Sequence, residues 1–173
     1  MDVTSSGKGE LCLKGPTVIQ GYFENEKANK ESWDAEGYFK SGDVIEVDPK
    51  TGLMYVVERV KELIKVRGFQ VAPAELEGVL LEHRDITDAA VIGIPAADNV
   101  ELPRAYVVRR EGTNLQEAEI QTFMKERLAG YKQLVGGVVF VKEIPKLPSG
   151  KILKRVLRDM AKQQAGTKYE AKL

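Results

Sequence analysis

Charged residues with potential roles in phosphate chemistry lie in three segments of the chain. Lys151 ends the first of these, residues 145–151 (PKLPSGK), whose prolines and glycine predict a loop of restricted shape. We expect a helix to begin at Ile152, directly after this lysine. A loop lysine can place its ammonium group against phosphate or carboxylate oxygens. The order of residues is not that of a Walker-type loop, and a solvated lysine at a helix start is the alternative interpretation.

The second segment, residues 57–77, contains alternating cations. These are Arg59, Lys61, Lys65 and Arg67. On an extended strand the four side chains would share one face. Such a face suits a nucleotide or the phosphates of CoA, and a solvated edge strand is the equally plain alternative.

The third segment, residues 37–43 (GYFKSGD), ends in an aspartate. We expect Ser41, Gly42 and Asp43 to form a turn. A carboxylate placed there can accept two hydrogen bonds from a ribose diol. Alone this signal is weak, because most Gly-Asp pairs are only turns.

Short strands and turns are predicted in the first third of the chain, and strands alternating with helices in the rest. Asn25 is expected to cap a helix over 25–32, and residues 44–57 to form a hairpin. Strands are predicted at 63–66, 89–94, 104–109 and 138–141, and helices at 73–82, 115–128 and 152–164. The change near 58–61, from short strands and turns to strands alternating with helices, predicts a domain boundary. The alternation itself predicts an α+β fold.

Composition limits the classes of function. The 173 residues carry 26 basic and 26 acidic side chains, so net charge gives no argument for nucleic acid. No apolar run is long enough for a membrane span. Cys12 is the single cysteine, so no internal disulfide is expected, and we expect it to be buried and inert. The single histidine, His83, is expected to be a surface or capping residue.

Taken in order along the chain, several motifs resemble the adenylate-forming superfamily of acyl-CoA synthetases, adenylation domains and luciferases. They are residues 9–16 (GELCLKGP), 21–23 (GYF), 41–43 (SGD), 59–77 and 148–151 (PSGK). The resemblance covers residues 9–158 and is greatest to 4-coumarate–CoA ligases, with luciferase also similar over 134–141. It implies a carboxy-terminal fragment of such an enzyme.

The resemblance also implies a domain organisation. Residues 1–58 would be the β-rich end of the large adenylating domain. Residues 59–165 would form the small mobile α+β lid domain, the AMP-binding-enzyme C-terminal domain. Residues 166–173 would be a flexible tail.

Residue roles carried over from the family begin with two lysines. Lys151 matches the lysine essential for adenylation, and Lys65 matches a lysine near the acyl-adenylate. Lys61 falls at the hinge about which the lid turns.

The remaining matched residues would bind cofactors. Asp43 would hold the ribose hydroxyls of ATP, Arg59 would contact the nucleotide, and Gln70 would lie near AMP. Arg67 and Gly68 lie where family members contact CoA. No residue of the chain is expected to ligate a metal directly.

The implied reaction is that of an ATP-dependent acyl-CoA ligase using ATP, CoA and Mg²⁺. It would convert an aromatic or aliphatic carboxylic acid such as 4-coumarate first to acyl-AMP and then to acyl-CoA. The family's phosphate loop and the rest of the large domain are not in this sequence, so we expect these residues alone to be inactive. Alternatives are a luciferase-like adenylating oxygenase, an adenylation domain that loads a carrier protein, and a non-catalytic module derived from the family.

The sequence ends in Ala171, Lys172 and Leu173, which resembles a Ser-Lys-Leu peroxisomal address. This predicts a peroxisomal protein recognised by an import receptor. The alternatives are a chance tripeptide and a cytoplasmic protein.

Overall fold

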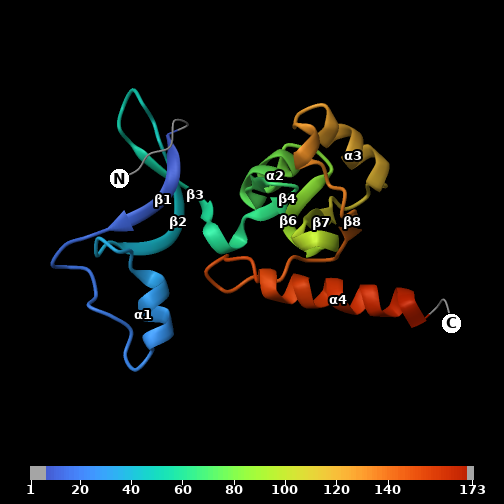
Figure 1. Cartoon of the computed structure of the whole chain (residues 1–173). Helices are drawn as coiled ribbons and strands as arrows, with labels where there is room; N and C mark the ends of the chain where they lie inside the picture. Colours follow the sequence, from blue (N-terminus) through green and yellow to red (C-terminus); the bar gives the residue numbers. More distant parts are fainter. Residues whose placement is uncertain (1–6, 171–173) are drawn as a thin grey trace. The chain divides into compact units, whose positions relative to one another are not determined.

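Two compact units make up the computed structural model, in which residues 7–170 are described, together with their side chains apart from those of Ala97 and residues 165–170. Unit 1 ends at Glu62 and unit 2 begins at Leu63. Helices and strands occur together in the chain (Figure 1), in agreement with the predicted α+β class.

Unit 1 is built on a three-stranded antiparallel sheet. Its strands, in the order β1–β2–β3, are β1 (Lys8–Leu13), β2 (Phe39–Val47) and β3 (Met54–Arg59). Helix α1 (Glu26–Ser32) joins β1 to β2, and the 3-10 turn η1 (Val60–Glu62) follows β3.

The predicted cap of helix α1 is confirmed. The Asn25 side chain accepts a hydrogen bond from the backbone N–H of Ala28 at 3.1 Å. This satisfies one of the amide groups that a helix start leaves without a helical partner.

The predicted turn at Ser41, Gly42 and Asp43 is wrong. All three lie inside β2, which continues to Val47. The register against β1 shifts there, and Gly42 has φ of 76°. This is a bulge, at which glycine admits the left-handed conformation that other residues avoid. Asp43 therefore projects from a strand and not from a loop.

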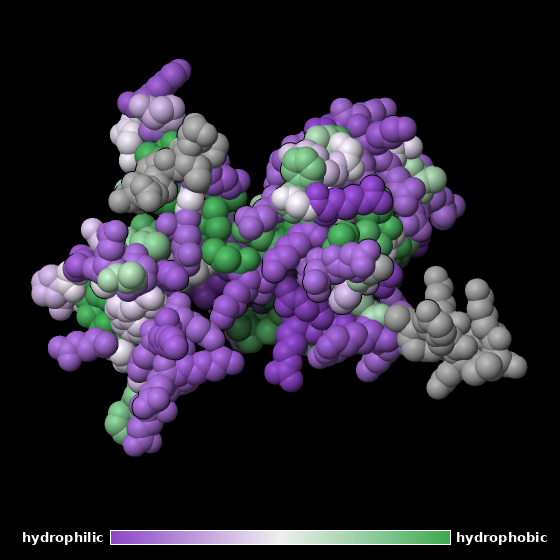
Figure 2. Space-filling view, in the orientation of Figure 1, coloured by the Kyte–Doolittle hydropathy of each residue, from purple (hydrophilic) through white to green (hydrophobic). Residues whose placement is uncertain are grey.

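The core of unit 1 is small. Among its described residues only Val44 and Ile45 are buried hydrophobic residues. The edge strand β3 and the residue before it leave four successive apolar side chains exposed, namely Leu53, Met54, Tyr55 and Val56. Figure 2 shows hydrophobic surface around β3 among mostly hydrophilic neighbours. Cys12, which was expected to be buried, is only half-buried, and this burial is the main cause that raises the pKa of its thiol above the ordinary value.

Unit 2 is built around a three-stranded sheet in the order β6–β7–β8. Strands β6 and β7 are antiparallel, whereas β8 is parallel to β7. Its elements in chain order are β4 (Ile64–Val66), β5 (Phe69–Val71), α2 (Pro73–Leu81), β6 (Ile86–Pro95), η2 (Ala97–Asn99), β7 (Glu101–Arg109), α3 (Glu117–Lys125), η3 (Gly130–Lys132), β8 (Val138–Phe140) and α4 (Lys154–Glu170).

Apolar side chains cover both faces of this sheet. On one face, residues of β4, β5, α2 and α3 pack against β6 and β7, with Leu76, Leu80 and Ile120 fully buried. On the other face Leu157 and Ala161 of α4 pack with Tyr106. Figure 1 shows α2 and α3 on one side of the sheet and α4 on the other.

The predicted helices and strands of unit 2 are confirmed, with shifts at their ends. Helix α2 begins at Pro73, where proline is favoured because its missing N–H has no helical partner. Helix α4 begins at Lys154, two residues later than expected, and continues past Gln164 to Glu170.

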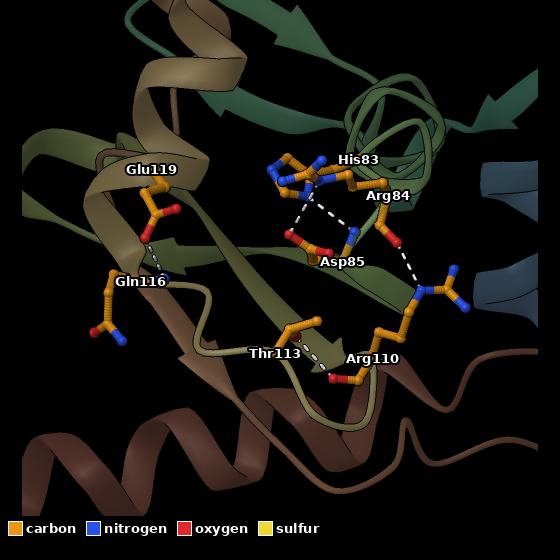
Figure 3. Close-up of polar contacts among 7 residues, drawn as sticks. All are labelled: His83, Arg84, Asp85, Arg110, Thr113, Gln116 and Glu119. Atoms are coloured by element: carbon orange, nitrogen blue, oxygen red, sulfur yellow. Dashed lines mark hydrogen bonds and ion pairs between the residues drawn. The ribbon is translucent and has the colours of Figure 1, made fainter.

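The loop after α2 is tied to the end of β7 by polar contacts (Figure 3). His83 is half-buried, and its Nδ1 accepts a hydrogen bond from the backbone N–H of Asp85 at 3.2 Å. The Arg110 Nε donates to the Arg84 carbonyl at 2.7 Å, and the Thr113 hydroxyl donates to the Arg110 carbonyl at 2.8 Å. His83 therefore stabilises the loop after α2 and is not the cap of that helix, whose C-cap residue is Glu82.

A membrane span was not expected. Within the part of the chain that the structure describes, every helix is too short or too polar to cross a bilayer.

Candidate functional site

Asp43 and Arg59 form a pair in unit 1. They are direct partners across β2 and β3, and the Arg59 Nε lies 3.0 Å from the Asp43 Oδ1. The Asp43 side chain is 27% exposed and the Arg59 side chain is 63% exposed. A pair this exposed adds little to stability. It presents a carboxylate and a guanidinium together to solvent, where both remain accessible to a ligand.

The predicted strip of four alternating cations does not exist as one extended face. Strand β3 ends at Arg59, and the 3-10 turn that follows contains Lys61. Arg67 has φ of 46° and lies in a turn. The prediction assumed that one strand continued through all four residues. The 3-10 turn after β3 and the turn at Arg67 interrupt the strand, so the four side chains do not share one face.

Lys61 lies at the end of unit 1. The division between the units falls after Glu62, one residue further on. The role of Lys61 as a hinge remains a prediction.

Four predicted site residues are brought together by the β4–β5 hairpin. Lys65 and Gln70 are opposite each other in the antiparallel pair, and both are exposed. Arg67 and Gly68 form the two-residue turn between the strands, and both have positive φ. Such turns match the twist of the paired strands. A left-handed conformation costs a residue such as Arg67 roughly 1–2 kcal/mol, so the hairpin presents its arginine at the tip in spite of this cost.

An aromatic contact supports the hairpin. The rings of Phe69 and Tyr131 are stacked, with centroids 4.3 Å apart and planes inclined by 14°. Sequence reasoning missed this pair, because the hydrophobic periodicity of one segment gives no signal for a contact with η3 so far along the chain. Offset-stacked pairs of this kind add roughly 0.5–1.5 kcal/mol.

Lys151 lies on a second hairpin and not at a helix start. The Leu147 N–H donates to the Lys151 carbonyl at 2.9 Å, and the Gly150 N–H donates to the Leu147 carbonyl at 2.8 Å. Lys146 and Ile152 form an isolated antiparallel bridge at the base. Lys151 is exposed, and helix α4 begins three residues later. The predicted loop of restricted shape is therefore confirmed. Lys151 lies before the first turn of α4 and so is not part of the helix.

The two predicted catalytic lysines are carried by elements on opposite faces of one sheet. The hairpin of Lys65 inserts Ile64, Val66 and Val71 into the cluster shared with α2 and α3. The hairpin of Lys151 leads into α4 and packs through neighbouring residues in the second cluster. The two lysines are therefore carried by hairpins that pack on different faces of the unit 2 sheet.

Other contacts around these hairpins were also missed from the sequence. Lys146 forms an ion pair with Asp88 at 2.7 Å, and Lys154 lies 3.7 Å from Glu77. Their partners lie far apart in sequence, so no local pattern indicates them.

No group of three or more His, Cys, Asp or Glu side chains is arranged to hold a metal ion among residues 7–170. The tripeptide Ala171, Lys172 and Leu173 lies outside the described residues, so its predicted targeting role remains a prediction.

Comparison with known proteins identifies the class. Residues 75–151 match the AMP-binding enzyme C-terminal domain. ATP-bound MatB from Rhodopseudomonas palustris superposes with a TM-score of 0.79 and 33% identity over 88% of this chain and 30% of its own. The family match and the similarity of fold indicate one class of protein, the adenylate-forming enzymes.

Curated relatives narrow the class. Acyl-CoA synthetase ACTT5 from Alternaria alternata is 55% identical over 89% of this chain and 27% of its own length. Peroxisomal OPC-8:0-CoA ligase 1 from Arabidopsis thaliana is 50% identical over 88% and 28%, respectively. Probable 4-coumarate–CoA ligase 2 from Dictyostelium discoideum is 46% identical over 88% and 28%. Over nearly nine tenths of its length the chain is thus similar to acyl-CoA synthetases and ligases, which places its likeness among the adenylate-forming enzymes. It spans less than a third of the length of each of these relatives.

Proposed function

We propose that this chain supplies the C-terminal domain, and the adjoining end of the large domain, of an ATP-dependent acyl-CoA ligase. The observation that carries the proposal is that the hairpin of Lys65 packs in the cluster on one face of the unit 2 sheet, whereas the hairpin of Lys151 packs in the cluster on the other face. A domain with two such faces can serve two half-reactions by presenting one face at a time.

In the first half-reaction a substrate carboxylate attacks the α-phosphate of ATP, and pyrophosphate leaves. Lys151 places its ammonium group against the oxygens that gather negative charge around that phosphorus. Asp43 accepts hydrogen bonds from the ribose hydroxyls, and Arg59 beside it contacts the nucleotide. Mg²⁺ would enter bound to the phosphates of ATP, and the described residues need contribute no ligand set of their own.

In the second half-reaction the thiol of CoA attacks the acyl carbonyl, a C–S bond forms and AMP leaves. Unit 2 turns about Lys61, which withdraws Lys151 and presents the β4–β5 hairpin. Lys65 and Gln70 then lie at the adenylate, while Arg67 and Gly68 contact CoA.

The substrate is a small carboxylic acid, and an aromatic acid such as 4-coumarate is the proposed example. The named relatives include a probable 4-coumarate–CoA ligase and a peroxisomal ligase. The second of these, together with the tail tripeptide, supports the proposed peroxisomal location. Binding of a fluorescent Ala-Lys-Leu-ended peptide to a peroxisomal import receptor tests that location, and no binding would contradict it.

The lysine assignment is tested in the full-length ligase, meaning the protein in which these residues are joined to the rest of a large adenylating domain. Lys151→Ala should lower the rate of acyl-AMP formation by about 10²- to 10³-fold, because one preorganised charge is lost. Thioester formation from supplied acyl-AMP should stay near the wild-type rate. Pyrophosphate exchange measures the first half-reaction, and acyl-CoA release measures the second.

A matched control is Lys142→Ala, which removes an exposed lysine from the loop preceding the hairpin and should leave both rates unchanged. Equal loss of both half-reactions in Lys151→Ala would contradict the two-face assignment.

Residues 1–173 alone should not catalyse pyrophosphate exchange, because the acyl pocket and the phosphate loop of the family lie in the large domain. Clear turnover by the purified chain would overturn this part of the proposal.

A further inference from the structure

The outer edge of strand β6 is closed by a carboxylate from helix α2. The Glu77 Oε1 accepts a hydrogen bond from the backbone N–H of Val91 at 2.9 Å. Strand β6 is the end strand of its sheet, so this N–H has no neighbouring strand on that side. Glu77 therefore fixes α2 to the sheet edge at one point.

The same carboxylate oxygen lies 3.7 Å from the Nζ of Lys154. The Glu77 side chain is 13% exposed and the Lys154 side chain is 14% exposed. Helix α2 covers one face of the sheet and α4 covers the other (Figure 1). The ion pair thus joins the two faces around the edge of β6. In a site so poorly solvated, removing either charge costs far more than it would at the surface.

Lys154 is the first residue of α4, and little free chain separates it from Lys151. Ile152 is held in the bridge with Lys146, and the Leu153 N–H donates to the Pro145 carbonyl at 2.8 Å. A displacement of Lys154 must therefore be passed on to the hairpin that carries Lys151.

We propose that Glu77 and Lys154 are positioning residues for adenylation, which set the place of the Lys151 hairpin relative to the sheet. This inference rests on the proposed function of Lys151. It adds that this nearly buried ion pair links the helices on the two faces of the sheet, in addition to the Lys146–Asp88 pair that ties the hairpin of Lys151 directly to β6.

The hairpin of Lys65 has direct attachments to the sheet that do not involve this ion pair. It is attached to the sheet through apolar residues and through the Lys65 N–H, which donates to Glu101 at 2.9 Å. Loss of the Glu77–Lys154 pair should therefore affect the two half-reactions unequally.

Glu77→Gln in the full-length ligase is the main test. The amide oxygen can still accept from the Val91 N–H, while the charge facing Lys154 is lost. A misplacement of about 1 Å can lower a rate by about 10²-fold. We expect kcat for acyl-AMP formation to fall by about 10²-fold, with KM for ATP and the rate of thioester formation from supplied acyl-AMP little changed.

Two variants control for general damage to the fold. Asp159→Asn removes an exposed carboxylate from α4 that pairs with Arg155 and Lys162, and it should leave both half-reactions unchanged. Lys154→Arg keeps the positive charge beside Glu77 and should retain most of the adenylation rate, whereas Lys154→Met should lose it as Glu77→Gln does.

The outcomes separate this inference from the proposed function. If Lys151→Ala abolishes adenylation and Glu77→Gln does not, the positioning role is wrong and the role of Lys151 stands. If Lys151→Ala leaves adenylation intact, the proposed function itself fails. If Glu77→Gln lowers both half-reactions equally, the pair is only structural and the inference is overturned. If Glu77→Gln does not fold, Lys154→Met compared with Lys154→Arg takes its place. Loss of adenylation alone in Lys154→Met supports the positioning role, and equal loss of both half-reactions overturns it.

Discussion

Units 1 and 2 both carry predicted ligand-binding residues, but only unit 2 has a core that supports them. In unit 2 two apolar clusters cover the two faces of a sheet. In unit 1 two buried hydrophobic residues are found among the described part, and an edge strand exposes a row of apolar side chains. The exposed Asp43–Arg59 pair adds little to stability. Among the described residues, unit 2 therefore encloses its own apolar side chains, whereas unit 1 leaves many of them exposed.

The largest expected effect follows directly from this contrast. Residues 63–173 produced alone should unfold in one cooperative transition with urea, because their hydrophobic clusters are complete. Residues 1–62 alone should show no cooperative transition, because a chain of this size with so small a core is not stable. Circular dichroism during a urea titration measures both.

A sharp transition from residues 1–62 would show that the exposed apolar row needs no partner, and the contrast between the units would be lost. Mixing the two pieces is the control for mutual stabilisation, since a transition that appears only in the mixture would assign it to association.

A smaller effect separates buried from exposed apolar residues within one helix. Leu80 is fully buried and the adjacent Leu81 is 49% exposed. Leu80→Ala should lower the free energy of unfolding of residues 63–173 by about 2–5 kcal/mol, since it leaves a cavity. Leu81→Ala should change it by less than about 0.5 kcal/mol. Similar effects of the two substitutions would mean that the first cluster is not packed as described.

Local sequence patterns predicted the elements of unit 2 well, because each depends on neighbouring residues. Proline at Pro73 and the spacing of Leu76 and Leu80 were sufficient for α2. The order of motifs along the chain was sufficient for the family, and it singled out the residues of both hairpins.

The predictions from sequence were wrong or incomplete where backbone geometry or contacts between distant residues determine the local structure. Nothing in the sequence near Gly42 distinguishes a bulge from a turn, because both accept a glycine with positive φ. The 3-10 turn η1 and the hairpin turn at Arg67 broke a regular alternation of charges. The ion pair of Glu77 with Lys154 joins helices on opposite faces, and local periodicity carries no information on such a pair.

The smallest predicted effect concerns Tyr106 in the core between the sheet and α4. Its side chain is buried and its hydroxyl donates to the Leu157 carbonyl at 3.1 Å. Burial raises the pKa of Tyr106 above its ordinary value, although nearby Arg104 opposes the shift. In the unfolded chain a tyrosine loses its proton at a pH of about 10. As the pH rises above that value, the unfolded state is deprotonated first and the folded state loses stability.

Tyr106→Phe isolates this contribution. Near neutral pH the variant should be less stable by about 1 kcal/mol, the usual net worth of one hydrogen bond. Above a pH of about 10 the difference from the wild type should shrink, because phenylalanine has no proton to lose in the unfolded state. Urea unfolding of residues 63–173 across this range measures both. The other ionisable groups are the same in the two proteins and cancel in the difference. A difference that stays constant with pH would mean that the hydroxyl titrates alike in both states, and so is not enclosed between the sheet and α4.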